Sequence, residues 1–326
     1  AHSGRAIVDG FIAGYEATAA LYDGLELRYP VHPHAGLAGV GAVVGLAVGR
    51  GLDPLPAARI AGTLPVVPVW AACFDGATAR HAFAGSAAAG AVRAQQLADA
   101  GFTGSPQAIG DLFDGIVADA RWAPPAEGES DSDPYILRAS VKLHSACLTC
   151  HAAIDAALAL GPIATGEIGD IAIATSADVA EKVGRQAAPN DLSARFSLPY
   201  AVATALRNGR ADAAAFAYEE TVGALAAKAT ISVDDGLPTA GHAMPARVTV
   251  TMLDGTRRSS EVVFPRGHHT RPATEDDLQI KFLSLTGGDA ALWQRVLDLD
   301  KAGPGASRRL LCRDWGGTVG RHDRRR

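Results

Sequence analysis

The spacing of the hydrophobic residues changes along this chain, and that change restricts the fold more than any other feature. From Ile7 to about Val117, apolar residues recur at helical spacing between Gly and Pro breaks, which predicts a stack of helices. Farther along, EIGDIAIATS (167–176) alternates as a strand does, and ARVTVTMLDGTRRSSEVVFP (246–265) predicts a hairpin that turns at Asp254-Gly255. The chain is therefore expected to combine helical and α+β regions.

The same change predicts how the chain is divided into domains. A mostly α fold with an α+β insertion is expected: a helical domain over 1–135, a smaller α+β domain over 136–271, a return to the helical domain over 272–302, and a basic, disordered tail over 303–326. Helices are also expected at 176–183 and 198–207. In the return segment, Thr274 is a candidate N-cap with Asp277 in the capping-box position.

Glycines in the first region have two interpretations. Gly41, Gly45 and Gly49 lie four residues apart, so they would share one face of a helix that could approach a neighbour closely. Gly39, Gly41 and Gly45 also fit a loose dinucleotide-binding pattern, but the preceding LRYPVHPHA (27–35) contains two prolines and would make a poor buried strand. We favour the close helix contact.

Composition and charge exclude several classes of protein. The chain is 48% hydrophobic but only 6% aromatic, which favours close-packed helices. Residues 301–326 carry a net charge of +6 and the rest of the chain −11, but the basic tail lacks aromatic residues spaced for nucleic-acid binding. The longest apolar run, 37–49, is shorter than the roughly 20 residues of a membrane span. Without a visible signal peptide or a disulfide pattern, a cytoplasmic protein is expected.

The motif Cys147-x-x-Cys150-His151 is the pattern of c-type haem attachment, and it could also contribute zinc ligands. Haem attachment would need an export signal and a sixth ligand, and a zinc site would need a second Cys/His pair at close spacing. A haem or metal carrier therefore stays a minor alternative, and no cofactor or metal is expected.

Taken whole, VKLHSACLTCHAAIDAALAL (141–160) resembles the signature of the MmgE/PrpD family, which includes 2-methylcitrate dehydratases, cis-aconitate decarboxylases and iminodisuccinate epimerases. The matching positions are Lys142, His144, Cys147 and His151, with Ala152 where the family often has Pro. Five further stretches resemble the family in order and rough spacing: GYEATAALYD (14–23), HPHAGLAGVGAVVGLAVGRGLD (32–53), ATARHAFAGSAAAGAVRAQQLADAGFTG (77–104), RFSLPYAVATALRNG (195–209) and PRGHHTRPATEDDLQIKF (265–282).

The resemblance implies a helical domain built from both ends of the chain, an inserted α+β domain, and an active site between them that works without metal or cofactor. It implies small di- or tricarboxylate substrates and a homodimer. By family match, Lys142 would hold a carboxylate or stabilise an enolate, Tyr200 would be a proton donor or carboxylate ligand, and His32 would be a base or carboxylate ligand. Arg80, His144 and Cys147 would bind substrate. His34 and His151 would contact these residues without touching the substrate.

At two positions, this sequence differs from the residues that cis-aconitate decarboxylases of the family have. Arg80 stands where those enzymes have a functional Lys, and Cys147 where they have His. Elimination of water by a 2-methylcitrate dehydratase-like enzyme is therefore the favoured activity, with decarboxylation and epimerisation as alternatives. A non-catalytic family remnant is another alternative, because family chains have further helices before the segment that matches 14–23.

Overall fold

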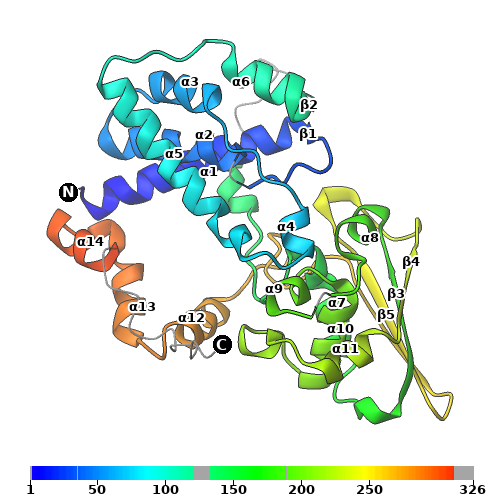
Figure 1. Cartoon of the computed structure of the whole chain (residues 1–326). Coiled ribbons are helices and arrows are strands. Elements are labelled where there is room, and N and C mark those ends of the chain that lie inside the picture. The colour runs from blue at the N-terminus through cyan, green and yellow to red at the C-terminus, as the bar shows by residue number, and fades with distance from the viewer. Residues whose placement is uncertain (1, 35, 121–132, 188, 312–326) are drawn as a thin grey trace, which may run out of the picture. The chain divides into compact units, whose positions relative to one another are not determined.

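The computed structural model describes residues 2–34, 36–120, 133–187 and 189–311 (Figure 1). Its contacts divide the chain into two compact units. The first unit comprises Ala1–Val69, His81–Leu137 and Gln279–Arg326, and the second comprises Trp70–Arg80 and Arg138–Leu278. The described chain is mostly helical with an α+β part, as the sequence predicts.

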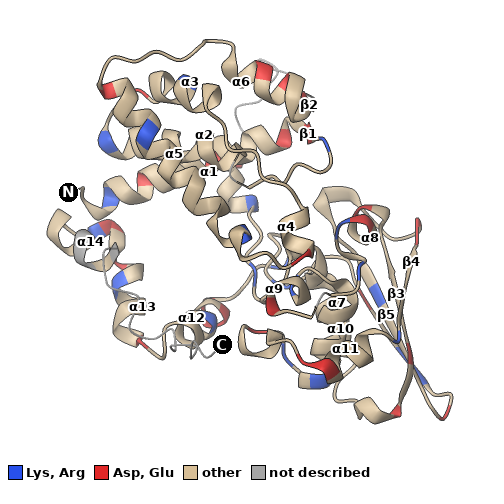
Figure 2. Cartoon of the chain, viewed as in Figure 1, with Lys and Arg blue, Asp and Glu red and all other residues tan. Residues whose placement is uncertain are grey.

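The first unit consists of helices and two short strands. Its α-helices and strands are α1 (Gly4–Asp23), β1 (Leu25–Leu27), α2 (Gly36–Arg50), α3 (Leu55–Thr63), α5 (Ala82–Asp99), α6 (Ala108–Asp111), β2 (Ala118–Ala120), α13 (Ala290–Leu297) and α14 (Pro304–Leu311). Strands β1 and β2 pair antiparallel. Helix α2 has no charged residue before Arg50 (Figure 2), because it is packed between neighbours.

Helices α1 and α2 meet through glycine backbone. A Cβ atom added to Gly45 of α2 would lie 2.6 Å from the carbonyl oxygen of Gly10, and one added to Gly14 of α1 would lie 2.6 Å from the carbonyl oxygen of Gly41. The close approach predicted from the glycine spacing is confirmed. The dinucleotide-loop alternative is wrong, because Gly39, Gly41 and Gly45 all lie within a regular helix.

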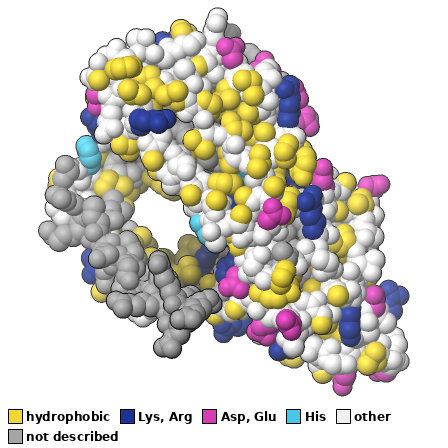
Figure 3. All heavy atoms as spheres, in the orientation of Figure 1, with side chains coloured by type: hydrophobic (Ala, Val, Ile, Leu, Met, Phe, Trp, Pro, Cys, Tyr) yellow, Lys and Arg dark blue, Asp and Glu magenta, His cyan; other side chains and the backbone are white. Residues whose placement is uncertain are grey.

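Apolar side chains also remain on the surface of the first unit. In the face shown in Figure 3, hydrophobic side chains gather over this unit. Its exposed large apolar residues include Leu55, Leu64, Val66, Val67, Val92 and Phe102. No helix among the described residues is long and apolar enough to cross a membrane.

The second unit is the α+β part. Its α-helices and strands are α4 (Ala71–Phe74), α7 (His151–Ala159), β3 (Ile168–Thr175), α8 (Ala177–Val183), α9 (Asp191–Ala194), α10 (Leu198–Asn208), α11 (Glu220–Ala226), β4 (Ala229–Val233), β5 (Ala246–Met252) and β6 (Arg257–Val262). Helix α12 (Glu275–Leu285) follows, and it runs from this unit into the first.

The four strands form one sheet in the order β4-β3-β5-β6. Strand β3 pairs parallel with β4 and antiparallel with β5, and β5 pairs antiparallel with β6. Gly255, in the turn between β5 and β6, has a φ of +84°, a conformation that glycine adopts readily. The strand predicted at 167–176, the hairpin turning at Asp254-Gly255 and the two helices predicted at 176–183 and 198–207 are confirmed.

One face of this sheet is covered and the other is polar. Helices α7 and α10 contribute the fully buried Ile154, Ala157, Leu198 and Val202 to a core that also contains the inward side chains of β3 and β5. On the opposite face, Arg247 of β5 pairs with Asp234 and Glu261 at 2.9 and 2.8 Å. Alternation of buried and half-buried residues along β5 reflects this one-sided burial.

Segment Trp70–Arg80 joins the second unit although it lies between two parts of the first in sequence. Ser193 donates its hydroxyl to the carbonyl oxygen of Phe74 at 2.8 Å, and the Arg185 guanidinium lies 3.9 Å from the centroid of the Phe74 ring. These contacts bring Arg80 into the unit that contains Lys142 and His144.

The return helix begins as predicted. The Thr274 hydroxyl accepts a hydrogen bond from the Asp277 backbone N–H at 3.2 Å, and the Asp277 carboxylate accepts one from the Thr274 N–H at 3.0 Å. This reciprocal pair is a capping box. Helix α14 occupies Pro304–Leu311, where a disordered tail was expected to have begun. The rest of that tail and most of the acidic stretch 123–134 lie outside the described residues.

Candidate functional site

The residues before α7 are held in place by backbone hydrogen bonds. This segment has no regular structure until the short 3-10 helix Leu148–Cys150. Three of its amides donate to carbonyl groups of separate loops, each at 2.8 Å: Val141 to Gly267, Ser145 to Ala211 and Cys147 to Arg195. The positions of Lys142, His144 and Cys147 are therefore set by contacts distant in sequence.

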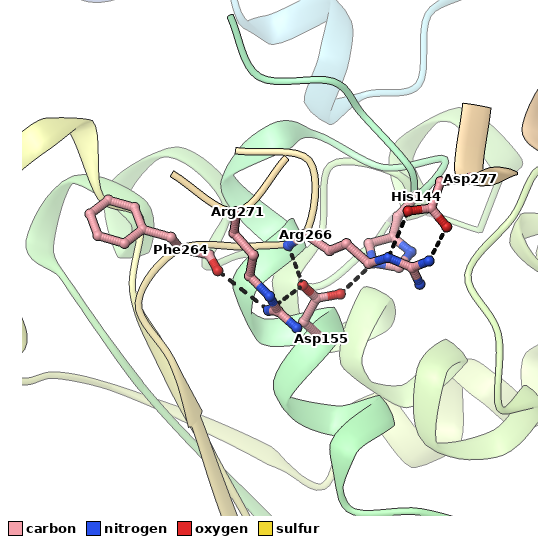
Figure 4. Close-up of polar contacts among 6 residues, drawn as sticks. All are labelled: His144, Asp155, Phe264, Arg266, Arg271 and Asp277. Atoms are coloured by element: carbon pink, nitrogen blue, oxygen red, sulfur yellow. Dashed lines mark hydrogen bonds and ion pairs between the residues drawn. The ribbon is translucent and has the colours of Figure 1, made fainter. Parts of the chain in front are cut away.

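His144 pairs with an aspartate of α7. Its Nε2 atom lies 2.8 Å from Oδ1 of Asp155, and the two side chains are 12% and 10% exposed. The other carboxylate oxygen of Asp155 accepts the backbone N–H of Arg266 at 2.6 Å and lies 3.5 Å from Nη1 of Arg271 (Figure 4). The carboxylate thus gathers three donors from two segments of the chain.

The charge of Asp155 is stabilised by those donors. Burial alone would raise the pKa of this carboxyl group. The hydrogen bonds from His144 and the Arg266 amide, with the charges of His144 and Arg271, outweigh that effect and lower the pKa below its ordinary value. Asp155 is therefore ionised at neutral pH, and an ionised carboxylate can only accept hydrogen bonds.

The loop that contacts Asp155 is itself anchored. The guanidinium of Arg266 binds the carboxylate of Asp277 through two nitrogens, with Nε 3.0 Å from Oδ2. Asp277 is the capping-box residue of α12, so one side chain closes the helix terminus and holds Arg266. The Arg266 amide is thereby kept in place to donate to Asp155.

Two cations lie near the start of α7. The Lys142 ammonium is 3.5 Å from the carbonyl oxygen of Ala146. Burial raises the pKa of the Cys73 thiol to about 11, and the hydrogen bond and charge of Arg80, with the charge of Lys142, oppose that rise. Because Arg80 and Lys142 both act on Cys73, they share one neighbourhood, although they are far apart in sequence.

His151 is buried behind His144. Its side chain is fully buried, and the two imidazole centroids are 5.0 Å apart. Neither ring nitrogen has a hydrogen-bond partner at ordinary geometry among the described residues, although the Ala146 backbone is close enough to raise the pKa slightly. Burial, with the nearby His144 and Lys142, lowers the pKa of His151 to about 3. His151 is therefore neutral in the folded protein.

The haem-like motif is poorly exposed for attachment. Cys150 is fully buried, and burial raises the pKa of its thiol well above its ordinary range. Cys147 is half-buried, and its sulfur accepts the Thr149 hydroxyl at 3.0 Å. Covalent haem attachment requires both thiols to reach the porphyrin, which the burial of Cys150 prevents in this fold. Among the described residues, no three His, Cys, Asp or Glu side chains are grouped to hold a metal.

Tyr200 lies in the core of the second unit. It is 1% exposed, and its ring stacks on Tyr218 with centroids 5.4 Å apart. Its hydroxyl accepts the Glu219 N–H at 2.8 Å and donates to the carbonyl oxygen of Ala217 at 3.3 Å. Burial raises the pKa of this phenol. These contacts support a packing role, and a substrate would have to displace one of the two bonds.

His32 belongs to the first unit. Its Nδ1 accepts the His34 backbone N–H at 3.2 Å, and its ring packs edge-on against Phe83 with centroids 5.4 Å apart. The ring also borders a mainly apolar pocket of about 250 Å³ with Val31 and Phe113. His32 therefore braces the turn before α2, and the structure does not place it in one unit with Lys142, His144, Cys147, Arg80 and Tyr200.

Sequence reasoning missed Asp155, Arg266 and Arg271. Asp155 lies four residues after His151, which places both on one face of α7. The two arginines lie in PRGHHTRP (265–272), where no local pattern indicates a partner on α7. His268, in the same stretch, is 5% exposed and its ring stacks on Phe264.

Comparison with known families gives a match for the part of the chain that contains this site. Residues 144–300 match the family model described as the MmgE/PrpD C-terminal domain. The match contains His144, Cys147, Asp155 and Tyr200, and Lys142 lies two residues before it. No curated protein matches the chain. The resemblance found in the sequence is thereby confirmed over residues 144–300, which match the C-terminal domain of the MmgE/PrpD family of dehydratase- and lyase-like proteins.

Proposed function

We propose that this protein is a lyase that removes a proton alpha to a carboxylate of a small di- or tricarboxylate and eliminates water, in the manner of a 2-methylcitrate dehydratase. One observation carries the proposal. Lys142 and Arg80 share a neighbourhood beside the entry to α7, and the His144–Asp155 pair lies on the same segment within the family match.

The two cations suit a substrate that bears more than one carboxylate. Arg80 can bind a carboxylate through two parallel hydrogen bonds, whereas the ammonium of Lys142 acts as a compact charge. When the alpha proton leaves, negative charge spreads onto the carboxylate oxygens as an enolate. A cation already in place interacts more strongly with this enolate charge than with the neutral carbon of the bound substrate. It therefore lowers the barrier.

The proposed reaction consumes no co-reactant. A base takes the alpha proton, the electrons of the C–H bond form the new C=C bond, and the C–O bond to the neighbouring hydroxyl breaks. Hydroxide leaves with a proton as water. Tyr200, predicted as proton donor by family match, holds the carbonyl of Ala217 by the longer of its two hydrogen bonds, the one a substrate would exchange. His32 and Cys147 keep their predicted roles as base or carboxylate ligand and as substrate contact.

Decarboxylation and epimerisation begin with related enolate chemistry and are the alternative reactions. Arginine stays charged at all physiological pH values, so Arg80 can clamp a carboxylate but cannot shuttle a proton as a lysine can. This difference makes a mechanism of the cis-aconitate decarboxylase type less suitable for this chain than dehydration.

A non-catalytic protein that keeps the fold is the second candidate. The observation that favours it is the Tyr200 hydroxyl, whose donor and acceptor are both bonded to backbone within the unit. Such a protein would bind polycarboxylates at Lys142 and Arg80 without turning them over. The homodimer expected from the resemblance belongs to both candidates, and light scattering would test it.

Proton NMR in D2O tests the proposal directly. Purified protein is mixed with 2-methylcitrate, citrate, cis-aconitate or an iminodicarboxylate, and loss of C–H signals and growth of vinyl signals are followed. We expect a dehydratable substrate to react, Lys142→Ala to lower the rate about 100-fold or more, and Arg80→Lys to weaken binding. Lys182→Ala is the matched control, because Lys182 pairs with the exposed Asp178 on the outer side of α8.

The pattern of results separates the candidates. A vinyl product that disappears with Lys142→Ala supports the dehydratase, and C–H exchange without a vinyl product indicates an epimerase. Binding without any exchange, in a folded protein, would support the non-catalytic candidate. Equal losses in Lys142→Ala and Lys182→Ala would refute the proposed site.

A further inference from the structure

The hydrogen bond between His144 and Asp155 restricts which imidazole nitrogen can meet a substrate. Because the carboxylate of Asp155 is ionised and only accepts, Nε2 of His144 must carry the hydrogen of the 2.8 Å bond. In the neutral ring the other nitrogen, Nδ1, then bears the free electron pair. If His144 touches a substrate as an acceptor, it can do so only through Nδ1.

The position of Asp155 is fixed by more than its own rotamer. Oδ1 faces His144, whereas Oδ2 accepts the Arg266 amide and lies near the Arg271 guanidinium (Figure 4). Rotation of the carboxylate would break three contacts together. The Arg266 amide is in turn held by the Arg266–Asp277 pair, so the orientation of His144 is linked to the start of α12.

We propose that Asp155 is a positioning residue, which holds His144 in the Nε2–H tautomer and leaves Nδ1 to take the alpha proton of the substrate. This inference rests on the proposed function and assigns the base of that reaction to His144, which leaves His32 the role of carboxylate ligand. In the proton transfer, Nδ1 forms a bond to hydrogen, the C–H electron pair moves into the enolate, and the resulting imidazolium is stabilised by the Asp155 carboxylate. The imidazolium afterwards returns its proton to solvent.

The surroundings of His144 suit that transfer. A histidine that becomes positive is destabilised by other positive charges nearby. His151, with its ring centroid 5.0 Å away, stays neutral because it is buried. Asp155 provides the compensating negative charge, while Arg271 and Lys142 are the cations on the neighbouring segments, and Arg271 is itself paired with Asp155.

A purely structural tie between α7 and the loop at 264–271 would use the same contacts, so the test must read more than stability. Nitrogen-15 NMR of labelled histidine distinguishes a protonated from an unprotonated ring nitrogen and needs no substrate. The protein has 10 histidines, and His144→Gln assigns the His144 signals by their loss. We expect wild-type His144 to show a protonated Nε2 and an unprotonated Nδ1.

Variants of Asp155 then connect the tautomer to the chemistry. Asp155→Asn offers an amide N–H that can donate to Nε2, which favours the opposite tautomer, and we expect the rate of C–H exchange to fall about 100-fold. Asp155→Glu keeps an acceptor and should recover part of the rate. In the His144→Gln background, Asp155→Asn should cause no further loss, because a residue that acts through His144 has nothing left to act on. Asp178→Asn is the matched control, because the Asp178 side chain of α8 is exposed.

The outcomes separate this inference from the proposed function. If the wild-type protein exchanges no C–H of any substrate, the proposed function fails, and with it the proton transfer, while the NMR spectrum still decides the tautomer. If the wild type is active but His144 carries its hydrogen on Nδ1, or if Asp155→Asn keeps full activity, the inference is overturned and the function stands. Additive losses in the double variant would also overturn it.

Discussion

The α1–α2 contact in the first unit and the entry to α7 in the second are both tightly packed, but they depend on opposite properties. In the first, Gly10, Gly14 and Gly45 lie directly against backbone atoms of the facing helix, and Gly41 leaves room for the Thr18 side chain of α1. In the second, the Asp155 carboxylate gathers an imidazole, an amide and a guanidinium. The first contact requires residues without a side chain, whereas the second requires charged and polar groups.

This difference decides which substitutions each region tolerates. A contact between glycine backbones has no flexible side chain that could move aside, so every added atom displaces a helix. At a carboxylate that accepts several hydrogen bonds, a substitution that keeps the volume and an acceptor costs less than one that removes the carboxylate. Removal leaves the donors without an acceptor. Substitutions that add side-chain atoms therefore test the first unit, and substitutions that remove a polar group test the second.

Gly45→Leu should have the largest effect. The new Cβ would meet the carbonyl oxygen of Gly10 at 2.6 Å, so α1 and α2 must separate, at a cost of about 3 kcal/mol or more in the free energy of unfolding. Urea unfolding measures the total, and hydrogen exchange of α1 peptides locates the loss in the first unit.

Gly39→Ala on the same helix is the matched control for that substitution. Nothing lies within 4 Å of a Cβ added there, so the better helix propensity of alanine should stabilise the protein by up to about 1 kcal/mol. Equal stability of the two variants would mean that α1 and α2 do not meet through these glycines.

Asp155→Ala comes next, with an expected loss of about 2 to 3 kcal/mol, because it leaves the largely enclosed His144 side chain and the Arg266 amide without their acceptor. Hydrogen exchange should increase at the Arg266 amide and leave α1 unchanged. Asp178→Ala, which breaks an exposed pair with Lys182, should stay within about 0.5 kcal/mol of wild type. A loss spread evenly over both units would contradict the local origin of the effect.

The same contrast explains what could be predicted from the sequence. The glycine face of α2, the hairpin turn at Gly255 and the Thr274–Asp277 capping box follow rules that relate residues a few positions apart. Local spacing contains those rules in full, and the structure confirms all three features.

The site depends instead on residues that loops bring together. Asp155 and Arg266 are 111 positions apart, and Arg80 lies in the same neighbourhood as Lys142 only because Trp70–Arg80 packs into the second unit. No local pattern contains such distances, so the family resemblance could suggest Lys142 and Arg80 but neither the Asp155 pairing nor the enclosed hydroxyl of Tyr200.

Acid should weaken the second unit through His151, by about 2 kcal/mol between pH 6.5 and 4.5. The unfolded histidine takes a proton near its ordinary pKa of 6.5, whereas the folded one, with a pKa of about 3, does not. The unfolded state therefore binds more protons in this window, and the free energy of unfolding decreases by up to about 1.4 kcal/mol for each pH unit of acidification. His151→Leu should flatten this dependence. Above pH 4.5, Asp155 adds little, because its lowered pKa matters only in stronger acid.

Urea unfolding of both proteins at several pH values measures this difference. The first unit provides an internal comparison, since hydrogen exchange of its α1 and α2 peptides should respond equally to pH in wild type and His151→Leu. A variant that keeps the full acid dependence would show that His151 is protonated in the folded state, which would also remove the neutral neighbour proposed for His144.

The smallest effect is expected at the capping box, where Thr274→Ala removes the acceptor of the Asp277 N–H and should cost about 1 kcal/mol. Thr274→Ser keeps the hydroxyl and should change stability by a few tenths of a kcal/mol at most. Because Asp277 also binds Arg266, the alanine variant should increase hydrogen exchange at the Arg266 amide as well as in α12. Faster exchange in α12 alone would mean that the loop holding Asp155 does not depend on the helix terminus, and it would separate the stability of the cap from the orientation of His144.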